Sequence, residues 1–553
     1  MAAAKKLQRG GHLDEARRAC ALVLEHEPQH PGAILRLALI ARQQRQPQEA
    51  ERLLSDLISR QPDNIFAIRL LVAVWREAGQ PSRGLALLDS LMPPLPEDAG
   101  LLLEKARCCI DQGDVGAAIP LLRRSVELDP GDADAHSLLG VALRRSGDRA
   151  AALVAFRAAV ELNPKDGHAL NGLGNDALEK EHFGEAATLY RRAVEASPSL
   201  HKAHKNLAYA LSLANDIAGA RAAFERIVDL FPGFHEARMD FGLFLLSIGE
   251  YPRGWQEYEH RWSFQGFSER DWGGGLPRWD GTSLAGRRLL LWGEQGIGDH
   301  ILYGTMLPDA LRRAGGDVTL AVEARLVPIF RRSLGGHGVA VIGRGEPVEA
   351  DVQCPFGGLG GFLRATPQQC GPGRYLRADA ERSGAIRRRY AERWPAARRL
   401  IGLSWRSANW HVGDYKSLDL ETLRPVLSKP GIAWVSLQYG QVAPEIAAFA
   451  KRHGIEVFQD PEIDPTNDLD GLAAQISALD GVVSISNSTV HFAGALGKPC
   501  WVLLSAGRGR MWYWPRENER TPWYDSLRLI HQAKPADWAG AMGRLGEALD
   551  AAG

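Results

Sequence analysis

Seven prolines divide the first half of this 553-residue chain into segments of equal length. They recur every 34 residues, at Pro28, Pro62, Pro96, Pro130, Pro164, Pro198 and Pro232. A fixed period of this length indicates a stack of similar helical units, each of which buries its apolar face against the next. The first half of the chain therefore predicts a solenoid rather than a closed core.

Small and aromatic residues recur within these units at matching positions. They are Leu139, Gly140, Ala152, Phe156 and Ala159 in one unit, Leu173, Gly174, Ala186, Tyr190 and Ala193 in the next, and Leu207, Ala208, Ala220 and Phe224 in the third. Small residues let two helices approach closely, an aromatic residue fills the gap to the next unit, and proline ends the second helix.

The pattern is that of tetratricopeptide repeats, and it predicts an α-helical superhelix over residues 1–262. The first unit begins partway through the repeat, and a degenerate last unit, 234–262, keeps Gly242 and Tyr258 but loses the closing proline. Such a surface typically binds a partner protein, and homo-oligomerisation through the repeats is the alternative. We expect residues up to Trp262 to be separable from the second half.

The stretch Leu289 to Asp309 has a different character. A short apolar run, Leu289 to Trp292, predicts a buried parallel strand, and a glycine-rich turn, Gly293 to Gly298, follows it. A helix over 299–314 is expected next. This arrangement forms the mouth of a doubly wound sheet, where ligands bind beyond the strand ends. Asp299 lies in that mouth, although a simple helix cap would also explain it.

Strands and helices alternate from this point to the end of the chain, which predicts two α/β units. We expect a linker over 263–286, packed by Trp272 and Trp279, a first unit over 287–397 and a second over 398–553. The expected strands are 289–292, 318–322, 339–342, 351–354, 400–405, 433–437, 455–458, 481–485 and 500–504. Further helices are expected over 420–427, 468–479 and 489–496.

The segment GEQGIGDHILYGTMLP, together with PRWDG before it, resembles the heptosyltransferase-like glycosyltransferases (family 9) and their repeat-fused bacterial relatives, which include flagellin glycosyltransferases. The resemblance implies a GT-B fold, two Rossmann-like lobes of which the first takes the acceptor and the second a nucleotide-sugar donor. It also implies inverting, metal-independent chemistry with Asp299 as general base. Gly296 and Gly298 would form the turn beside the donor.

The resemblance also implies a set of donor-binding residues in the second lobe, and each has a structural alternative. Arg406 and Lys416 would face the donor phosphate, although either is also explained as a surface charge. Gln438 would contact the base or pack in the core. Ser486, Asn487, Ser488, Thr489 and His491 would form an anion site at a helix start, or cap and pack that helix. Several relatives have Asp where this chain has Ser486.

Two further segments have both functional and structural interpretations. Asn171 and Asn206 lie near positions that hold acceptor backbone in the related O-GlcNAc transferases, but the ladder of asparagines is incomplete here. The aromatic segment RGRMWYWPRENERTPWY stacks on a base or sugar in one interpretation and covers the core in the other.

Composition and spacing argue against several other classes. Lys and Arg (66) balance Asp and Glu (66), and no basic stripe indicates nucleic acid. There is no apolar run of about 18 residues to span a membrane and no secretory leader, so we expect a cytoplasmic protein. The six cysteines lack metal-type spacing, and Asp468 and Asp470 suit a helix cap better than a metal motif. No metal or cofactor is expected.

The sequence thus predicts a glycosyltransferase that moves a sugar from a nucleotide donor to Ser or Thr of a protein acceptor such as flagellin. Two alternatives stay open. One is transfer to lipopolysaccharide or another glycan, and the other is a catalytically silent repeat scaffold.

Overall fold

The computed structural model describes residues 1–91, 96–267, 272–371, 373–409 and 412–551. Part of the predicted linker (268–271), part of the loop before Lys416 (410–411) and the last two residues of the second lobe (552–553) lie outside these ranges. The chain forms two compact units, Met1–Ala214 and Asn215–Gly553.

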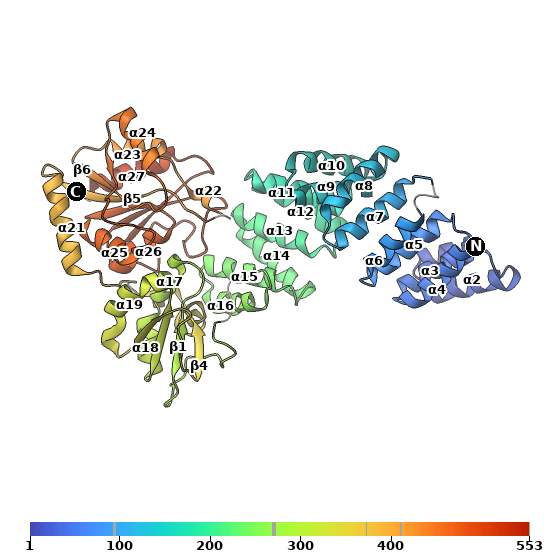
Figure 1. Cartoon of the computed structure of the whole chain (residues 1–553), viewed down its shortest axis with the longest axis horizontal. Coiled ribbons are helices and arrows are strands. Elements are labelled where there is room, and N and C mark those ends of the chain that lie inside the picture. Colours follow the sequence, from blue (N-terminus) through green and yellow to red (C-terminus); the bar gives the residue numbers. More distant parts are fainter. Residues whose placement is uncertain (92–95, 268–271, 372, 410–411, 552–553) are drawn as a thin grey trace. The chain divides into compact units, whose positions relative to one another are not determined.

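The first unit is a run of antiparallel helix pairs (Figure 1). Its helices are α1 (Ala2–Arg9), α2 (Leu13–His26), α3 (Pro31–Gln43), α4 (Pro47–Arg60), α5 (Ile65–Glu77), α6 (Pro81–Leu91), α7 (Ala99–Asp111), α8 (Val115–Leu128), α9 (Ala133–Ser146), α10 (Arg149–Leu162), α11 (Gly167–Glu179), α12 (Phe183–Ala196) and α13 (His201–Leu213). The predicted helical superhelix is therefore present.

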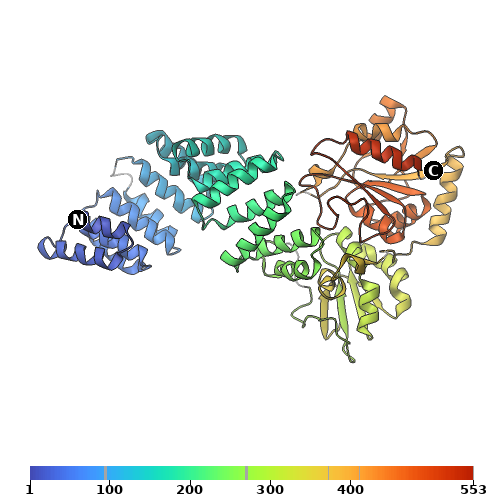
Figure 2. The same ribbon diagram turned by 180° about the vertical axis from the view of Figure 1, so that it is seen from behind.

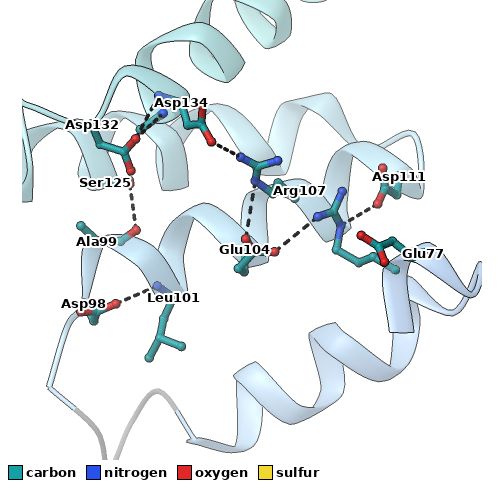
Figure 3. Close-up of polar contacts among 12 residues, drawn as sticks. Glu77, Asp98, Ala99, Leu101, Glu104, Arg107, Asp111, Ser125, Asp132 and Asp134 are labelled. Carbon is teal, nitrogen blue, oxygen red and sulfur yellow. Dashed lines mark hydrogen bonds and ion pairs between the residues drawn. The ribbon is translucent and has the colours of Figure 1, made fainter. Parts of the chain in front are cut away.

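The recurring small residues explain how these helices pack. A Cβ on Gly140 of α9 would collide with the Phe156 ring of α10, and one on Gly172 of α11 would meet the same ring. Several helices, among them α5 and α7 to α11, begin at an Asp or Asn side chain that caps the first turn. In Figure 3, Asp98 accepts from the Leu101 N–H at 2.9 Å, which ties down the start of α7.

Ion pairs connect successive helix pairs at a regular spacing. Arg76 pairs with Asp111 at 2.7 Å and with Glu104 at 3.3 Å. Figure 3 shows the next pairs in the series, in which Arg107 binds Glu104 at 3.6 Å and Asp134 at 3.2 Å. Other pairs repeat the arrangement: Arg42–Glu77 and Arg144–Glu179. Each joins one repeat to its neighbour, and partly exposed pairs of this kind add little to stability.

The second unit begins inside the repeat array, ahead of the boundary predicted at Trp262. It opens with α14 (Ile217–Leu230), α15 (His235–Ser247), α16 (Tyr251–Tyr258) and the 3-10 helix η1 (Glu259–Ser263). Trp255 and Tyr258 of α16 are buried in the hydrophobic core that the two sheets share. Removal of residues up to Trp262 would therefore open that core, against our expectation of a separable second half.

The first lobe contains a parallel sheet in the order β3-β2-β1-β4. Its strands are β1 (Leu289–Trp292), β2 (Val318–Val322), β3 (Ala340–Gly343) and β4 (Val352–Pro355), and its α-helices are α17 (Ile297–Gly304), α18 (Leu307–Ala314), α19 (Val327–Leu334) and α20 (Gly360–Leu363). Short 3-10 helices are η2 (Ala324–Leu326), η3 (Gly335–His337), η4 (Phe356–Leu359) and η5 (Pro367–Cys370). The helix predicted over 299–314 is wrong as one element. It breaks before α18, where Pro308 in the first turn has no N–H to continue the ladder.

The second lobe contains a six-stranded parallel sheet in the order β10-β9-β8-β5-β6-β7. The strands are β5 (Arg399–Ser404), β6 (Ile432–Ser436), β7 (Val457–Phe458), β8 (Gly481–Ile485), β9 (Cys500–Leu504) and β10 (Leu527–His531). Relative to the chain this is the order 3-2-1-4-5-6, with its switch point between β5 and β8. The helices are α21 (Ala380–Arg393), α22 (Gly413–Lys416), α23 (Leu420–Leu427), α24 (Ala443–His453), α25 (Leu469–Ala478), α26 (Ser488–Leu496) and α27 (Ala539–Ala551).

Helices cover both faces of this sheet, as Figure 1 and the reverse view in Figure 2 show. Alternate residues of each strand belong to different cores. Val482 faces the cluster that contains α25 and α26, whereas Val483 faces the one that contains α23 and α27. This burial on both sides explains the nearly continuous apolar runs in the sequence.

The linker packs against the first sheet instead of hanging free. Trp272 and Trp262 lie against Leu290 and Trp292, on the β1 face opposite α17. Trp279 is buried and its backbone N–H donates to the Gln353 carbonyl of β4 at 2.8 Å. The predicted packing by tryptophans is confirmed for the described part of the linker.

Candidate functional site

The turn between β1 and α17 presents Asp299 at the switch point of the first sheet. Gln295 adopts a left-handed conformation (φ 62°), and the Gly296 N–H donates to Asp299 Oδ2 at 3.1 Å. Asp299 therefore does cap the turn at the start of α17, as the structural interpretation holds. Its second oxygen has no hydrogen-bond partner among the described residues. That oxygen can therefore still accept a hydrogen bond or a proton while the first caps the turn.

The Asp299 carboxyl group has an unusual proton affinity. Burial raises the pKa of Asp299 to about 6, and the nearby charge of Glu294 adds to this effect. The hydrogen bond from Gly296 and the charge of Lys416 oppose it. A carboxyl group with a pKa near neutrality is suited to accept a proton.

Glu294 and His300, the other titratable residues of this segment, are less available as bases. Arg261 donates to both carboxylate oxygens of Glu294, at 3.1 and 3.2 Å, and the Gly357 N–H donates to Oε1 at 2.9 Å. Burial lowers the pKa of His300 to about 3, so its ring is neutral. Asp299 is the carboxylate of the turn that keeps an acceptor atom open.

Lys416, at the end of α22, approaches Asp299 from the second lobe. The side chain is 4% exposed, and burial lowers the pKa of Lys416 to about 8 while the charge of Asp299 opposes that shift. Lys416 also packs beside the loop that follows β9, where a Cβ on Gly509 would meet the Lys416 side chain at 2.9 Å. A buried cation thus faces a carboxylate across the two lobes.

A buried network ties together the strand ends at the second switch point. Asn487 donates to Ser404 Oγ at 2.8 Å and to the Arg406 carbonyl at 3.2 Å, which connects β8 to β5. Gln438, after β6, accepts from the Trp405 and Arg406 N–H groups, both at 2.8 Å. Its amide also donates to two backbone carbonyls. The side-chain amides of Gln438 and Asn487 are thus occupied in shaping the site.

Helix α26 begins beside Asp299. Asn487 caps it by accepting from the Thr489 N–H at 3.1 Å, and Ser488 is its first residue. The buried Thr489 hydroxyl has no hydrogen-bond partner within the described residues. A Cβ on Gly298 would lie 3.0 Å from the His491 ring and 3.7 Å from the Ser488 Cα. The glycine therefore permits close approach of α17 to the positive end of α26.

His491 is held by aromatic neighbours. Its Nδ1 lies 3.1 Å from the Tyr524 hydroxyl, and its ring stacks on Trp514 at 5.6 Å between centroids. Trp514 in turn donates to Ser486 Oγ at 2.8 Å. Burial lowers the pKa of His491 to about 3, so it acts as a neutral group. The aromatic segment here packs against site residues and α16, which favours its covering role.

The structure thus gathers most of the predicted site residues and leaves one at the margin. Arg406 contributes its backbone to the switch-point network, but its side chain is 51% exposed and pairs with Glu445 at 3.0 Å. Arg261 escaped the sequence interpretation because no periodic signal marked it. The density of Trp and Tyr after β9 did mark the aromatic segment, which supplies Trp514 and Tyr524 to the surroundings of His491.

A groove of about 900 Å³ lies within the first unit, lined by α7, α9, α11 and α13. Asn171 and Asn175 line it, and Asn206 donates to the side-chain oxygens of both, at 3.0 and 3.2 Å. The asparagines are thus joined to one another across neighbouring repeats.

Models of the tetratricopeptide repeat match residues 8–74 and, in overlapping segments, residues 76–233. The helix pairs and the matches agree. Residues 8–233 are tetratricopeptide repeats. The matched region ends at residue 233, in the turn after α14, and so reaches into the second compact unit.

Protein FlbA of Caulobacter vibrioides (strain ATCC 19089 / CIP 103742 / CB 15) is 32% identical to this chain over 335 residues, which is 55% of this chain and 53% of FlbA. The chain therefore spans about half the length of this curated relative.

Several solved repeat structures are similar to this chain, with low sequence identity and low TM-scores. The hetero-tetramer Cut9-Hcn1 of APC/C is 15% identical, with a TM-score of 0.40 over 46% of this chain and 51% of that one. YrrB, a repeat protein with an unusual peptide-binding site, is 18% identical, with a TM-score of 0.26 over 34% and 95%. A thermophilic repeat protein of Thermus thermophilus, TTC0263, is 19% identical, with a TM-score of 0.29 over 32% and 97%.

All six cysteines are buried and free. Within the described ranges, no helix combines the length and apolar character needed to cross a membrane.

Proposed function

We propose that this chain is an inverting, metal-independent glycosyltransferase of GT-B type. It transfers a sugar from a nucleotide-activated donor to a Ser or Thr hydroxyl of a protein acceptor that the repeats recruit. The observation that carries the proposal is the meeting of Asp299, from the first switch point, with Lys416 and the start of α26 from the second. Two parallel sheets with their switch points in one unit support a GT-B arrangement.

The proposed reaction is a single displacement. The acceptor hydroxyl oxygen attacks the anomeric carbon, the bond from that carbon to the donor phosphate breaks, and the nucleotide leaves with the bonding electrons. Asp299 takes the hydroxyl proton as the new bond forms. Inversion follows from attack on the face opposite the leaving group.

The second lobe would balance the leaving group's charge. Lys416 is a cation below about pH 8, and its charge acts on both Asp299 and His491 of α26. The unpartnered Thr489 hydroxyl adds a donor at the same place. Neutral His491 shapes the wall of the site. A cation and helix N-terminus together stabilise developing negative charge on a phosphate.

The repeats support recruitment of a protein, since tetratricopeptide arrays typically present grooves to polypeptides. The groove in the first unit is long enough to span four helices. We propose a bacterial surface protein such as flagellin as acceptor, with modification in the cytoplasm before export.

The test is transfer of label from a panel of nucleotide sugars. Thermal stabilisation first selects the nucleotide, because a ligand at about 100 times its Kd adds about 2.7 kcal/mol. Label on the protein acceptor, lost in Asp299→Asn, supports the proposal. Label on lipopolysaccharide alone would show that the acceptor is a glycan and not a protein. If no nucleotide raises the Tm, the result favours a catalytically silent repeat scaffold.

A further inference from the structure

We infer that Tyr258, the last residue of α16, and Arg261 of η1 are positioning residues that hold the Gly293–Gly298 turn and thereby place the Asp299 carboxylate. The inference rests on the proposed function of Asp299 as the base. It assigns to α16 and η1 a part in positioning the base, in addition to the recruitment proposed for the repeats.

Arg261 is inserted into the first lobe. The side chain is 0% exposed and its guanidinium donates to both oxygens of Glu294, the second residue of the turn. It also donates to the Tyr258 carbonyl at 3.2 Å and to Glu259 at 2.6 Å. A planar guanidinium bound on several sides fixes the orientation of the carboxylate that it pairs with.

Glu294 in turn binds the backbone of the segment that follows β4. Its Oε1 accepts from the Gly357 N–H at 2.9 Å, and a Cβ at Gly357 would collide with that oxygen. The end of β1 is thereby tied to the loop after β4. Buried pairs of this kind add little net stability, but they specify one arrangement.

Tyr258 holds the next residue of the turn. Its hydroxyl accepts from Gln295 Nε2 at 2.6 Å and lies 3.3 Å from the Tyr303 hydroxyl of α17. Gln295 is a non-glycine residue at φ 62°, a conformation that costs free energy unless neighbouring contacts enforce it. Asp299 follows at the third residue of α17, so the turn determines where its carboxylate points.

The pKa of Asp299 depends on the charges around it, so a change in that pKa separates a positioning role from a simple loss of packing. Glu294 raises the pKa of Asp299 and Lys416 lowers it, and Tyr258, Tyr303, Tyr513 and Tyr524 face it as neutral groups. Removal of the Glu294 charge should therefore lower the pKa of Asp299. A loss of packing alone would not move it in this way.

The first experiment compares Tyr258→Phe with Tyr251→Phe in the full chain. Both residues are buried on α16, but the Tyr251 hydroxyl bonds Cys370 and not the turn. We expect Tyr258→Phe to lower kcat about fivefold, as for the loss of one hydrogen bond, with the donor KM unchanged. Hydrogen exchange of 293–298 should quicken, and Tyr251→Phe should change neither.

The second experiment uses the double variant Arg261→Met with Glu294→Gln, which removes both buried charges together. We expect the acid limb of the kcat/KM profile to move to lower pH. An unmoved limb, or unchanged exchange at 293–298 in Tyr258→Phe, would overturn the inference. If the native chain shows no transferase activity while exchange still quickens in Tyr258→Phe, the proposed function fails and the hold on the turn stands.

Discussion

The Asp299 carboxylate combines two roles that the sequence presents as alternatives. It caps the start of α17 through Gly296, and its other oxygen stays open. The side chain is half-buried, and desolvation raises its pKa to about 6. The sequence motif predicted the residue. The sequence did not show that Arg261 pairs with Glu294 and makes it less available as a base. The two residues are far apart in the chain and share no motif.

Lys416 and Arg406 have different surroundings, so replacing them should give different results. Lys416→Met removes a buried cation and should weaken nucleotide binding by about 10- to 100-fold, as for a charge-assisted hydrogen bond. Arg406→Ala removes a half-exposed guanidinium that pairs with Glu445, and should cost much less. Titration calorimetry with the selected nucleotide measures both, and equal losses would contradict this ranking.

Gly298 tests the close approach of the two lobes. Gly298→Ala places a methyl group 3.0 Å from the His491 ring, whereas Gly296→Ala places one 3.4 Å from the Asp299 carboxylate. Alanine also favours the helix by about 1 kcal/mol, so Gly298→Ala should keep its Tm. We expect turnover to fall at least tenfold in Gly298→Ala and little in Gly296→Ala. Similar turnover in both would show that the approach is not needed.

At the scale of elements, the predicted strands agree closely with the structure because continuous apolar runs mark strands buried on two faces. β1, β2, β8 and β9 have the predicted bounds, and the others differ by one or two residues. β10 was missed because the aromatic segment before it obscured its start. α21 was missed because it is strongly polar and buries only Ile386 and Tyr390.

The interacting charges of Asp299 on α17 and Lys416 on α22 predict a bell-shaped pH dependence. Turnover should rise as pH increases through about 6, where Asp299 loses its proton. It should fall as pH increases through about 8, where Lys416 loses its charge. The kcat/KM profile measures both limbs, which belong to the pair as a unit. In Lys416→Met the alkaline limb should vanish, and its persistence would contradict the assignment.

At the scale of the whole molecule, the repeat period gave the helical array directly but not its last boundary. The second compact unit begins at Asn215, although the matched repeats continue to residue 233 and the sequence predicts the array to Trp262. Physical contacts explain the difference. Trp255 and Tyr258 are buried in the core of the sheets, and Arg261 is paired with Glu294. A repeat period records helix spacing and carries no information about such contacts.

Two truncations test this boundary. A chain that starts at Asn215 should remain folded and bind nucleotide, but it should not modify the protein acceptor. A chain that starts at Ser263 should be destabilised by at least about 3–5 kcal/mol, because Glu294 would be left buried without its partner. Denaturant unfolding and nucleotide titration measure both. Equal stability of the two chains would contradict the placement of α14–α16 in the second unit.

Turnover of Asp299→Asn, measured beside its thermal stability, tests most directly whether Asp299 takes the acceptor proton. Asparagine preserves the cap but accepts no proton, so turnover should fall about 10²–10⁴-fold. Because the folded state disfavours the ionised carboxylate, Asp299→Asn should match or exceed the native Tm at pH 8. That advantage should fade as pH falls through 6 towards 4. Full turnover in Asp299→Asn at pH 8 would show that Asp299 is not the base.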